Sequence, residues 1–448
     1  MEVHRYVANL GSTLNRPGLE RIHAMLEHLD HPECDFEIIH VVGTNGKGST
    51  AQFIASILQA AKKQVGLFTS PHLTKFNERI QVDGIPISDE VLDDIFQELY
   101  PCLEGLAGTA YGQPGMFEVA TALALKYFSV AGVDYAILEA GLGGRYDATH
   151  IGNPAITVFT HIDLDHTEIL GDTVDLIAEE KADVIYSGGI VVTAPQAASV
   201  KRVINRVARE RGARVIDVET EYRVEGALPQ SSGTSFSVSS RDHWRHLQIG
   251  LLGLFQITNA VTALAAVDAL AEKGLTLTDA QVVRGLAAAN WPGRLEKVGQ
   301  EPLVLLDGAH NLDGCRQLAA TLPVYFTWDR LHLIMSIVGE KPAQAMLQVL
   351  LPQVDHVVFT VPQTSRTQPM EPAALLQLAE GMVEEMDTAP SFDVAFEKAR
   401  QGAHSRDLIC ICGSLYLVGE ARKQLLAAEN LQGLCSPTQK TLRQGRMA

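Results

Sequence analysis

The stretch that most constrains the fold runs from Glu37 to Gln64, where a short apolar segment meets a glycine-rich loop and then a helical pattern. After the loop, apolar residues recur at helical spacing: Phe53, Ile54, Ile57, Leu58 and Ala61. A strand, a glycine-rich loop and a helix together hold phosphate through backbone N–H groups and the helix N-terminus. The stretch therefore predicts a nucleotide site, formed by Gly43, Thr44, Asn45, Gly46, Lys47, Gly48, Ser49 and Thr50.

One lysine and two hydroxyl residues complete the chemistry of this loop. Lys47 is predicted to reach the terminal phosphates, and Ser49 or Thr50 to contact magnesium. The spacing departs from the general phosphate-loop pattern, because Gly48 stands between Lys47 and Ser49. A tight strand-to-helix turn with an incidental lysine is the alternative. The agreement of glycines, lysine and helical periodicity favours the phosphate interpretation.

Composition narrows the class of protein. The 448 residues suggest two or three domains, and 46% hydrophobic with 20% charged residues is typical of a globular protein. The net charge of −17 argues against a nucleic-acid partner. The N-terminus lacks an apolar signal region, and no apolar stretch has membrane-spanning length. The six cysteines lack metal-type spacing, so we expect a cytoplasmic protein with reduced thiols that does not bind membranes.

Periodicity predicts an α/β protein of two domains. From residue 38 to about 193, apolar strands alternate with helices, which indicates a mostly parallel sheet. Within 214–252, four short runs (VIDV, YRVEG, SFSV and HLQIGLLG) predict a small antiparallel sheet. The pattern breaks at 291–294 and restarts at Leu303. We therefore expect a P-loop-type ATPase domain in residues 1–293, a smaller Rossmann-like domain in 294–431 and a flexible tail in 432–448.

Polar groups follow the predicted parallel strands, where such sheets bind ligands. The strand VGLF leads to Ser70, YAILEA contains Glu139, and AITVFT leads to a segment containing His166. Magnesium prefers oxygen ligands, so Ser70 and Glu139 fit readily and His166 fits least well. Glu139 is alternatively a salt-bridged or solvated strand end. His166 is alternatively a hydrogen-bonded structural histidine.

Lys181 falls on the apolar stripe of a predicted helix formed by Val174, Ile177, Ala178 and Ile185. A lysine on a core-facing side needs a partner or an altered charge. Alternatively, its stem lies along the apolar surface and its ammonium group reaches water.

In the second domain, Asp307-Gly-Ala-His310-Asn311 follows an apolar strand. Asp307 could reach a ribose hydroxyl, and His310 could face a phosphate or an acyl centre. Alternatively, either Asn311 or Asp307 is present because it caps the N-terminus of the following helix. Arg294, beside the domain break, could contact a nucleotide or be an ordinary surface arginine.

Several segments together resemble the folylpolyglutamate synthase/dihydrofolate synthase family, relatives of the Mur ligases. They span about residues 18 to 420 and include HVVGTNGKGST, FTSPHLTKFNERIQVDG, LEAGLGGRYDAT, DLDHTEILGDTVDLIAEEKADVI, NWPGRLE and LLDGAHNLDG. Mur ligases place the hydroxyl residue directly after the lysine, so Gly48 favours the folate branch.

The resemblance implies an ATP-dependent amide ligase with a Mur-ligase-like ATP-binding domain and a glutamate-ligase domain. ATP would phosphorylate a substrate carboxylate, and the amine of L-glutamate would attack the acyl phosphate. The implied ligands are ATP, Mg²⁺, L-glutamate and a folate or dihydropteroate, and the implied state is a monomer. Dihydropteroate and tetrahydrofolate both fit as acceptors, because both reactions share this intermediate.

The resemblance also implies roles for individual residues. Lys47 and His310 match catalytic positions, and Ser70, Glu139 and His166 match the metal ligands. Lys181 matches a lysine that relatives carry as a carbamate, an anion able to bind a second magnesium. Three residues match positions that contact the nucleotide in the family: Asn259, Arg294 and Asp307. The substrate loop, residues 70–79, and a nearby aromatic residue match the contacts to the pterin-containing substrate: Pro71, His72, Phe76, Arg79 and Phe117.

Three departures from the family pattern bear on these roles. Phe255 replaces a histidine near Asn259, and His150 replaces an asparagine. Asp183 is expected to make the surroundings of Lys181 more acidic. Two rival functions remain: a Mur-type ligase acting on a different carboxylate, and an ATP-binding switch without catalysis.

Overall fold

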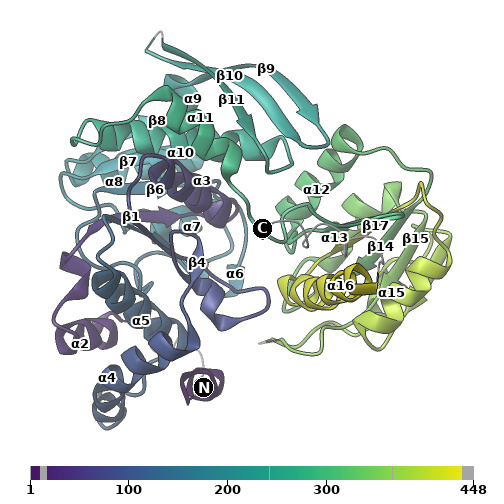
Figure 1. The fold of residues 1–448 in the computed structure, drawn as a ribbon, viewed down its shortest axis with the longest axis horizontal. Helices are drawn as coiled ribbons and strands as arrows, with labels where there is room; N and C mark the ends of the chain where they lie inside the picture. The colour runs from purple at the N-terminus through teal and green to yellow at the C-terminus, as the bar shows by residue number, and fades with distance from the viewer. Residues whose placement is uncertain (1, 11–17, 242, 366, 436–448) are drawn as a thin grey trace, which may run out of the picture. The chain divides into compact units, whose positions relative to one another are not determined.

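The computed structural model describes residues 2–10, 18–241, 243–365 and 367–435. They form two compact units, Met1–Trp291 and Pro292–Ala448 (Figure 1). No helix in these described ranges combines the length and apolarity needed to cross a membrane. The sequence Asn15-Arg16-Pro17-Gly18 predicts a turn, and its first three residues lie outside the described ranges.

The first unit is built on an eight-stranded sheet in the order β4-β3-β2-β5-β1-β6-β7-β8. Its parallel strands are β1 (Glu37–Val42), β2 (Val65–Phe68), β5 (Tyr135–Glu139), β6 (Ile156–Phe159), β7 (Ile190–Thr193) and β8 (Arg214–Asp217). At one edge the chain adds antiparallel β3 (Ile80–Val82) and β4 (Ile85–Pro86). The inner strands are almost wholly buried apolar runs, as a sheet covered on both faces requires. The predicted mostly parallel sheet is confirmed.

Helices cover both faces of this sheet because successive residues of a strand point to opposite sides. Ile38 and Leu138 pack with α2 (Glu20–His28), α4 (Asp89–Ala107) and α5 (Met116–Ala131). Ile39 and Ile137 pack with α3 (Lys47–Ala60), α10 (Phe255–Ala271) and α11 (Asp279–Ala288). The remaining helices of this unit are α1 (Glu2–Asn9), η1 (Pro32–Cys34), η2 (Phe76–Arg79), α6 (Thr167–Leu170), α7 (Val174–Ala182), α8 (Ala198–Glu210) and α9 (Val218–Glu221).

A small antiparallel sheet lies beside α10 and α11, as predicted, but it has fewer strands than expected. It contains β9 (Arg223–Gln230), β10 (Gly233–Ser240) and β11 (His243–Ile249). The VIDV run was expected here and instead forms most of β8, which pairs in parallel with β7. This part of the prediction is wrong because α8 connects β7 to β8, and such a crossover returns the chain parallel to the previous strand.

The second unit contains a six-stranded sheet in the order β12-β13-β17-β14-β15-β16, in which β12 is antiparallel to its neighbour. Its strands are β12 (Glu296–Gln300), β13 (Leu303–Leu306), β14 (Leu331–Met335), β15 (His356–Phe359), β16 (Glu385–Thr388) and β17 (Leu408–Cys412). Its helices are α12 (Leu312–Tyr325), α13 (Ala343–Leu350), η3 (Leu351–Gln353), α14 (Pro372–Leu378), α15 (Phe392–Gln401) and α16 (Leu415–Cys435). Cys410 and Cys412 are fully buried free thiols in β17.

The end of the chain is described only in part. The sequence predicts a flexible tail over 432–448, and α16 continues through the first four of these residues. Residues 436–448 lie outside the described ranges.

Gly285 of α11 supplies a test of the helix packing, because a Cβ there would lie 2.5 Å from Ile57 Cα. We expect Gly285→Ala to destabilise the first unit by about 1–3 kcal/mol through overpacking. The control is Gly105→Ala in α4, where a Cβ meets nothing within 4 Å. That change should stabilise the helix by about 0.5–1 kcal/mol. Thermal unfolding followed by circular dichroism measures both, and an unchanged midpoint for Gly285→Ala contradicts the close approach.

Candidate active site

The glycine-rich loop joins the carboxyl end of β1 to the first residue of α3, which is Lys47. Gly46 precedes the helix in the left-handed conformation, with φ 86°. The first amides of a helix lack intrahelical acceptors, so the start of α3 presents N–H groups suited to an anion. The amides of Thr44 and Asn45 donate to the His161 carbonyl at 2.8 and 3.2 Å. The loop is therefore fixed to the segment after β6.

Two glycines of the loop face neighbours that leave no room for a side chain. A Cβ at Gly43 would lie 2.0 Å from Thr160 Oγ1, at the end of β6. A Cβ at Gly46 would lie 2.4 Å from Asn259 Oδ1, in α10. Both glycines also have positive φ angles, which other residues rarely adopt. The Asn259 amide therefore lies directly against the loop, where the family resemblance places a nucleotide contact.

Gly48 is explained by Trp291, the last residue of the first unit. A Cβ at Gly48 would lie 2.8 Å from the indole ring. A hydroxyl residue directly after the lysine, as in Mur ligases, would collide with this ring. The unusual spacing of the loop therefore follows from packing, and the first hydroxyl group comes one residue later, at Ser49.

Gln256 connects Ser49 to Asn259 and was not singled out from the sequence. It is fully buried, and its Nε2 donates to Ser49 Oγ at 3.2 Å. Asn259 Nδ2 in turn donates to Gln256 Oε1 at 2.9 Å. The available signal was its position three residues before Asn259, which places both amides on one face of the helix. Phe255, which replaces the family histidine, instead places its ring against Gly253.

Two lysine ammonium groups converge on one carbonyl of the loop. Lys47 Nζ donates to Gly43 O at 3.2 Å and to Thr44 O at 3.1 Å. Lys181 Nζ donates to Gly43 O at 2.9 Å, and the residue is only 4% exposed. The alternative in which Lys181 reaches water is therefore wrong. Burial, followed by the charge of Lys47, lowers the pKa of Lys181 to about 7.

Asp183 does not act on Lys181 in the way expected from the sequence. Its carboxylate pairs with Arg145 at 3.0 Å and also with Arg211. Its charge is thus matched by two guanidinium groups, and the acids that affect the pKa of Lys181 are Asp147, Asp165 and Glu180. The expectation of a more acidic surrounding from Asp183 is wrong. His150 Nδ1 donates to the Arg145 carbonyl at 3.0 Å and so supports the same turn.

Of the predicted metal ligands, Ser70 follows β2, Glu139 ends β5, and His166 lies between β6 and α6. The Ser70 amide donates to Glu139 Oε2 at 3.0 Å, so these two residues are brought together. Glu139 is 5% exposed, which excludes a solvated strand end. His166 precedes α6 in the left-handed conformation, with φ 51°. Its ring is 44% exposed and lies 3.6 Å from the carboxylate of Glu168.

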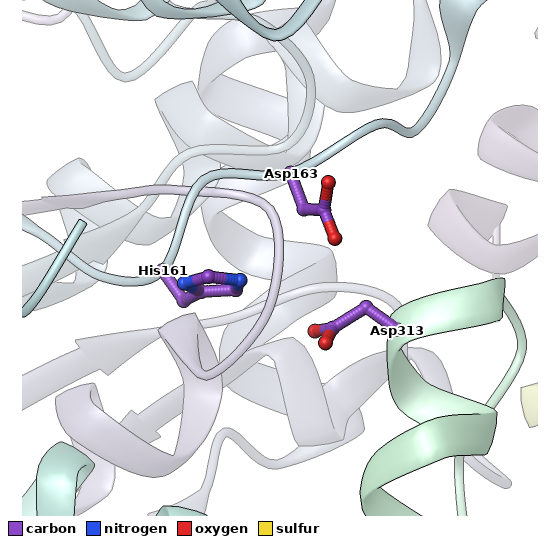
Figure 2. Close-up of side chains that lie close together, drawn as sticks. All are labelled: His161, Asp163 and Asp313. Carbon is purple, nitrogen blue, oxygen red and sulfur yellow. The ribbon is translucent and has the colours of Figure 1, made fainter. Parts of the chain in front are cut away.

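His161 and Asp163 are further candidate metal ligands, which the sequence pattern alone did not distinguish from His166. Both residues lie in the segment after β6, and their ligand atoms lie within 4.8 Å of each other. Figure 2 shows the two side chains. The Thr44 hydroxyl donates to the Asp163 carbonyl at 2.9 Å, so this segment adjoins the nucleotide loop. Figure 2 also labels Asp313, which belongs to α12 of the second unit.

The predicted substrate loop, residues 70–79, is closed at its base. The Thr69 amide donates to the Arg79 carbonyl at 3.0 Å. Arg79 is 2% exposed, and its Nε donates to His72 Nδ1 at 2.8 Å. The guanidinium also lies 5.9 Å from the ring centroid of Phe76. His72, Phe76 and Arg79 therefore form one cluster, whereas Pro71 is exposed.

Phe117 is half-buried at the start of α5. Its ring lies 5.5 Å from that of Phe68, and a Cβ at Gly141 would lie 2.7 Å from it. The ring thus packs beside the loop that follows Glu139. Next to it, Glu118 accepts from the Gly115 amide and pairs with buried Arg21 at 2.9 Å, which fixes the start of α5.

In the second unit, the Asp307 carboxylate fixes two backbone amides. Its carboxylate accepts from the amides of Leu295 at 3.0 Å and Ala309 at 2.9 Å. Burial raises the pKa of Asp307, although the charge of Arg294 opposes the shift. The helix N-cap is Asn311, whose Oδ1 accepts from the Gly314 amide at 2.8 Å. The N-cap alternative therefore applies to Asn311.

Arg294 and His310 adjoin Asp307 within the same unit. A Cβ at Gly308 would lie 2.5 Å from Arg294 Nη1, so the guanidinium rests on this turn. His310 Nδ1 lies 2.8 Å from the Gly308 carbonyl, which can only accept. Nδ1 therefore carries the proton in the neutral ring, and Nε2 is the basic nitrogen.

The fold and the loop chemistry define the class of protein, and comparison with known families agrees. Residues 91–267 match the Mur ligase middle domain, and residues 293–415 match the Mur ligase glutamate ligase domain. The dihydrofolate synthase/folylpolyglutamate synthase of Bacillus subtilis (strain 168) is 37% identical over 92% of this chain and 95% of its own length.

Solved structures are similar over nearly the whole chain. A Mycobacterium tuberculosis folylpolyglutamate synthase complexed with ADP and AMPPCP gives a TM-score of 0.88 at 32% identity, covering 95% of this chain and 97% of that one. An FPGS–AMPPCP–folate complex gives 0.85 at 31% identity, covering 95% and 99%. The chain belongs to the dihydrofolate synthase/folylpolyglutamate synthase family of ATP-dependent glutamate ligases, which confirms the resemblance seen in the sequence.

The contact between Gly48 and Trp291 leads to a test by a double-mutant cycle. Gly48→Ala should displace the first turn of α3 and raise the dissociation constant for ATP by about tenfold, equivalent to about 1.4 kcal/mol. Trp291→Leu removes the ring and should restore most of the affinity in the double variant. Equilibrium binding of a fluorescent ATP analogue measures all four proteins. An equal loss with and without Trp291 contradicts the packing explanation.

Proposed function

We propose that this chain attaches L-glutamate to the carboxylate of dihydropteroate, tetrahydrofolate or both. The acceptor carboxylate oxygen attacks the γ-phosphorus of ATP and forms an acyl phosphate with release of ADP. The glutamate amine then attacks the acyl carbon, loses its proton and expels phosphate. Phosphorylation is needed because a free carboxylate is a poor acyl acceptor.

The observation that carries the proposal is the position of Lys47 at the start of α3. Lys47 directs Nζ at Gly43 O beside the N-terminus of this helix. This arrangement favours a polyanionic phosphate chain. In the proposal, Lys47 turns from the loop carbonyls to the terminal phosphates and offsets the charge on the transferred group. Asn259, whose amide lies against Gly46, contacts the nucleotide.

Magnesium belongs to the proposal as a bound cofactor of ATP. The fit rests on Ser70 and Glu139, since the Ser70 amide donates to the buried carboxylate and both residues supply oxygen. His166 completes the proposed set. When bound, magnesium would neutralise phosphate charge during phosphoryl transfer.

Lys181 is proposed to carry a carbamate. A neutral amine is required to add carbon dioxide, and the pKa of about 7 supplies one near neutral pH. The reaction forms an N–C bond and releases the amine proton. The product is an anion beside Lys47, which replaces like-charge repulsion with attraction and suits a second magnesium.

The acceptor and the amine complete the proposed site. The 70–79 loop, with Pro71, His72, Phe76 and Arg79, holds the pterin-bearing acceptor beside Phe117. In the second unit, Arg294 and Asp307 contact the nucleotide, and His310 acts near the acyl phosphate. His310 Nε2 is the basic nitrogen that such a role requires.

The proposal also includes a cytoplasmic location and a monomeric state. Among the described residues, Cys34, Cys102, Cys315, Cys410 and Cys412 are free thiols, in keeping with a reducing compartment.

The direct test measures phosphate release by the purified chain with Mg-ATP, L-glutamate and either dihydropteroate or tetrahydrofolate. We expect turnover that needs glutamate and at least one acceptor, and the active acceptor identifies the reaction served. Lys47→Ala should reduce the rate by roughly 10²-fold or more while keeping the wild-type circular dichroism. Silence with both acceptors in protein that binds ATP contradicts the proposal and favours an ATP-binding switch.

Chemical rescue tests the carbamate. Lys181→Ala should lower the rate by roughly 10²-fold, and added acetate or formate should restore part of it by supplying a carboxylate. Lys47→Ala is the matched control, because a carboxylate does not replace a cation and rescue should fail there. A rate for Lys181→Ala that equals wild type, or a loss that carboxylates do not relieve, returns Lys181 to a purely structural role.

A further inference from the structure

The tip of the substrate loop surrounds one carboxylate, that of Glu78 in η2. The donors are three successive amides and one side chain: Leu73 N at 2.8 Å, Thr74 N at 3.2 Å, Lys75 N at 3.0 Å and the Thr74 hydroxyl. Successive amides that converge on one point form a concave feature of the kind that binds anions. Here the anion is a side chain of the same loop.

Glu78 itself is held in place from both sides. Its amide donates to the Lys75 carbonyl at 3.1 Å, and its carbonyl accepts from Gln81 Nε2 at 2.8 Å. The neighbouring Asn77 donates through Nδ2 to Ile87 O and Asp89 Oδ1, both at 2.8 Å. The carboxylate therefore projects from an anchored turn. The conformation of residues 73–75 therefore depends on the position of Glu78.

The charge of Glu78 matters to this arrangement. Burial alone would raise the pKa of Glu78, but the hydrogen bonds from Thr74 and from the amides of residues 73–75 outweigh it and lower that pKa. Hydrogen bonds to an ionised carboxylate are shorter and stronger than those between neutral groups. Without the carboxylate, the three converging amides would have no hydrogen-bond acceptor between them, which is unfavourable.

We propose that Glu78 is the positioning residue that fixes residues 73–75, directly after His72, in the conformation that receives the acceptor substrate. The inference rests on the proposed function, in which the 70–79 loop holds the pterin-bearing substrate. Glu78 directs its oxygens at the loop backbone and acts through His72 and the tip. It determines acceptor affinity and leaves the nucleotide loop unaffected.

The test replaces Glu78 with Gln, which keeps the size and removes the charge. The Michaelis constant for the acceptor should rise about tenfold, because a displaced binding loop loses productive contacts. The Michaelis constant for ATP, kcat and the unfolding temperature should stay near wild type. Glu78→Asp keeps the charge and should fall between the two. The matched control is Glu104→Gln, which removes an exposed carboxylate from α4 and should change nothing.

Trypsin gives a second readout, because Lys75 is exposed at the tip. Cleavage after Lys75, identified by fragment mass, should be faster in Glu78→Gln than in wild type or Glu104→Gln. Saturating acceptor should slow it in wild type.

A further variant, His72→Ala, separates failure of this inference from failure of the proposed function. If His72→Ala raises the acceptor Michaelis constant and Glu78→Gln does not, Glu78 is not a positioning residue and the loop keeps its assignment. If neither variant changes it, the loop does not hold the acceptor and both claims fall. If Glu78→Gln lowers kcat, ATP affinity and unfolding temperature together, its role is general stability and the inference is overturned.

Discussion

Close approach to the backbone of the 43–48 loop is the constraint on which the first unit depends. Thr160 at the end of β6, Asn259 in α10 and Trp291 at the end of the unit each occupy the space of a missing side chain. The three contacts come from parts of the chain far apart in sequence. The loop is therefore the point where these elements are fixed relative to one another, and the amides at the start of α3 keep their direction as a consequence.

The same packing creates an electrostatic conflict. Two ammonium groups lie within hydrogen-bonding distance of Gly43 O, and one of them belongs to the buried Lys181. Burial disfavours the charged form of Lys181, the adjacent cation adds to this effect, and the pKa of Lys181 is lowered as a result. An anion at the loop would remove the conflict for Lys47. Family membership and electrostatics thus point to the same ligand class by independent routes.

Much of the fold was predictable because the inner strands are short, continuous apolar runs separated by helical periodicity. The β8 segment was misplaced because it is the partly exposed edge strand of its sheet and lacks the continuous apolar run of the inner strands. Gln256 was missed because its partner Ser49 lies 207 residues away, and only the fold brings them together. The effect of Asp183 was misjudged for the same reason. The sequence shows only that Asp183 carries a negative charge, whereas the structure shows that Arg145 and Arg211 pair with it.

The two loops of the site use converging backbone amides in opposite ways. At the start of α3 the preceding residue is glycine, so the chain supplies no side-chain acceptor there and an external anion fits. At residues 73–75 the chain supplies the carboxylate of Glu78. A nucleotide must enter and leave in every cycle, which requires exchangeable contacts. A surface that distinguishes one acceptor substrate from another benefits instead from a fixed shape, because less conformational entropy is then lost on binding. The Glu78 carboxylate gives the loop that shape without taking up the space where the acceptor substrate would bind.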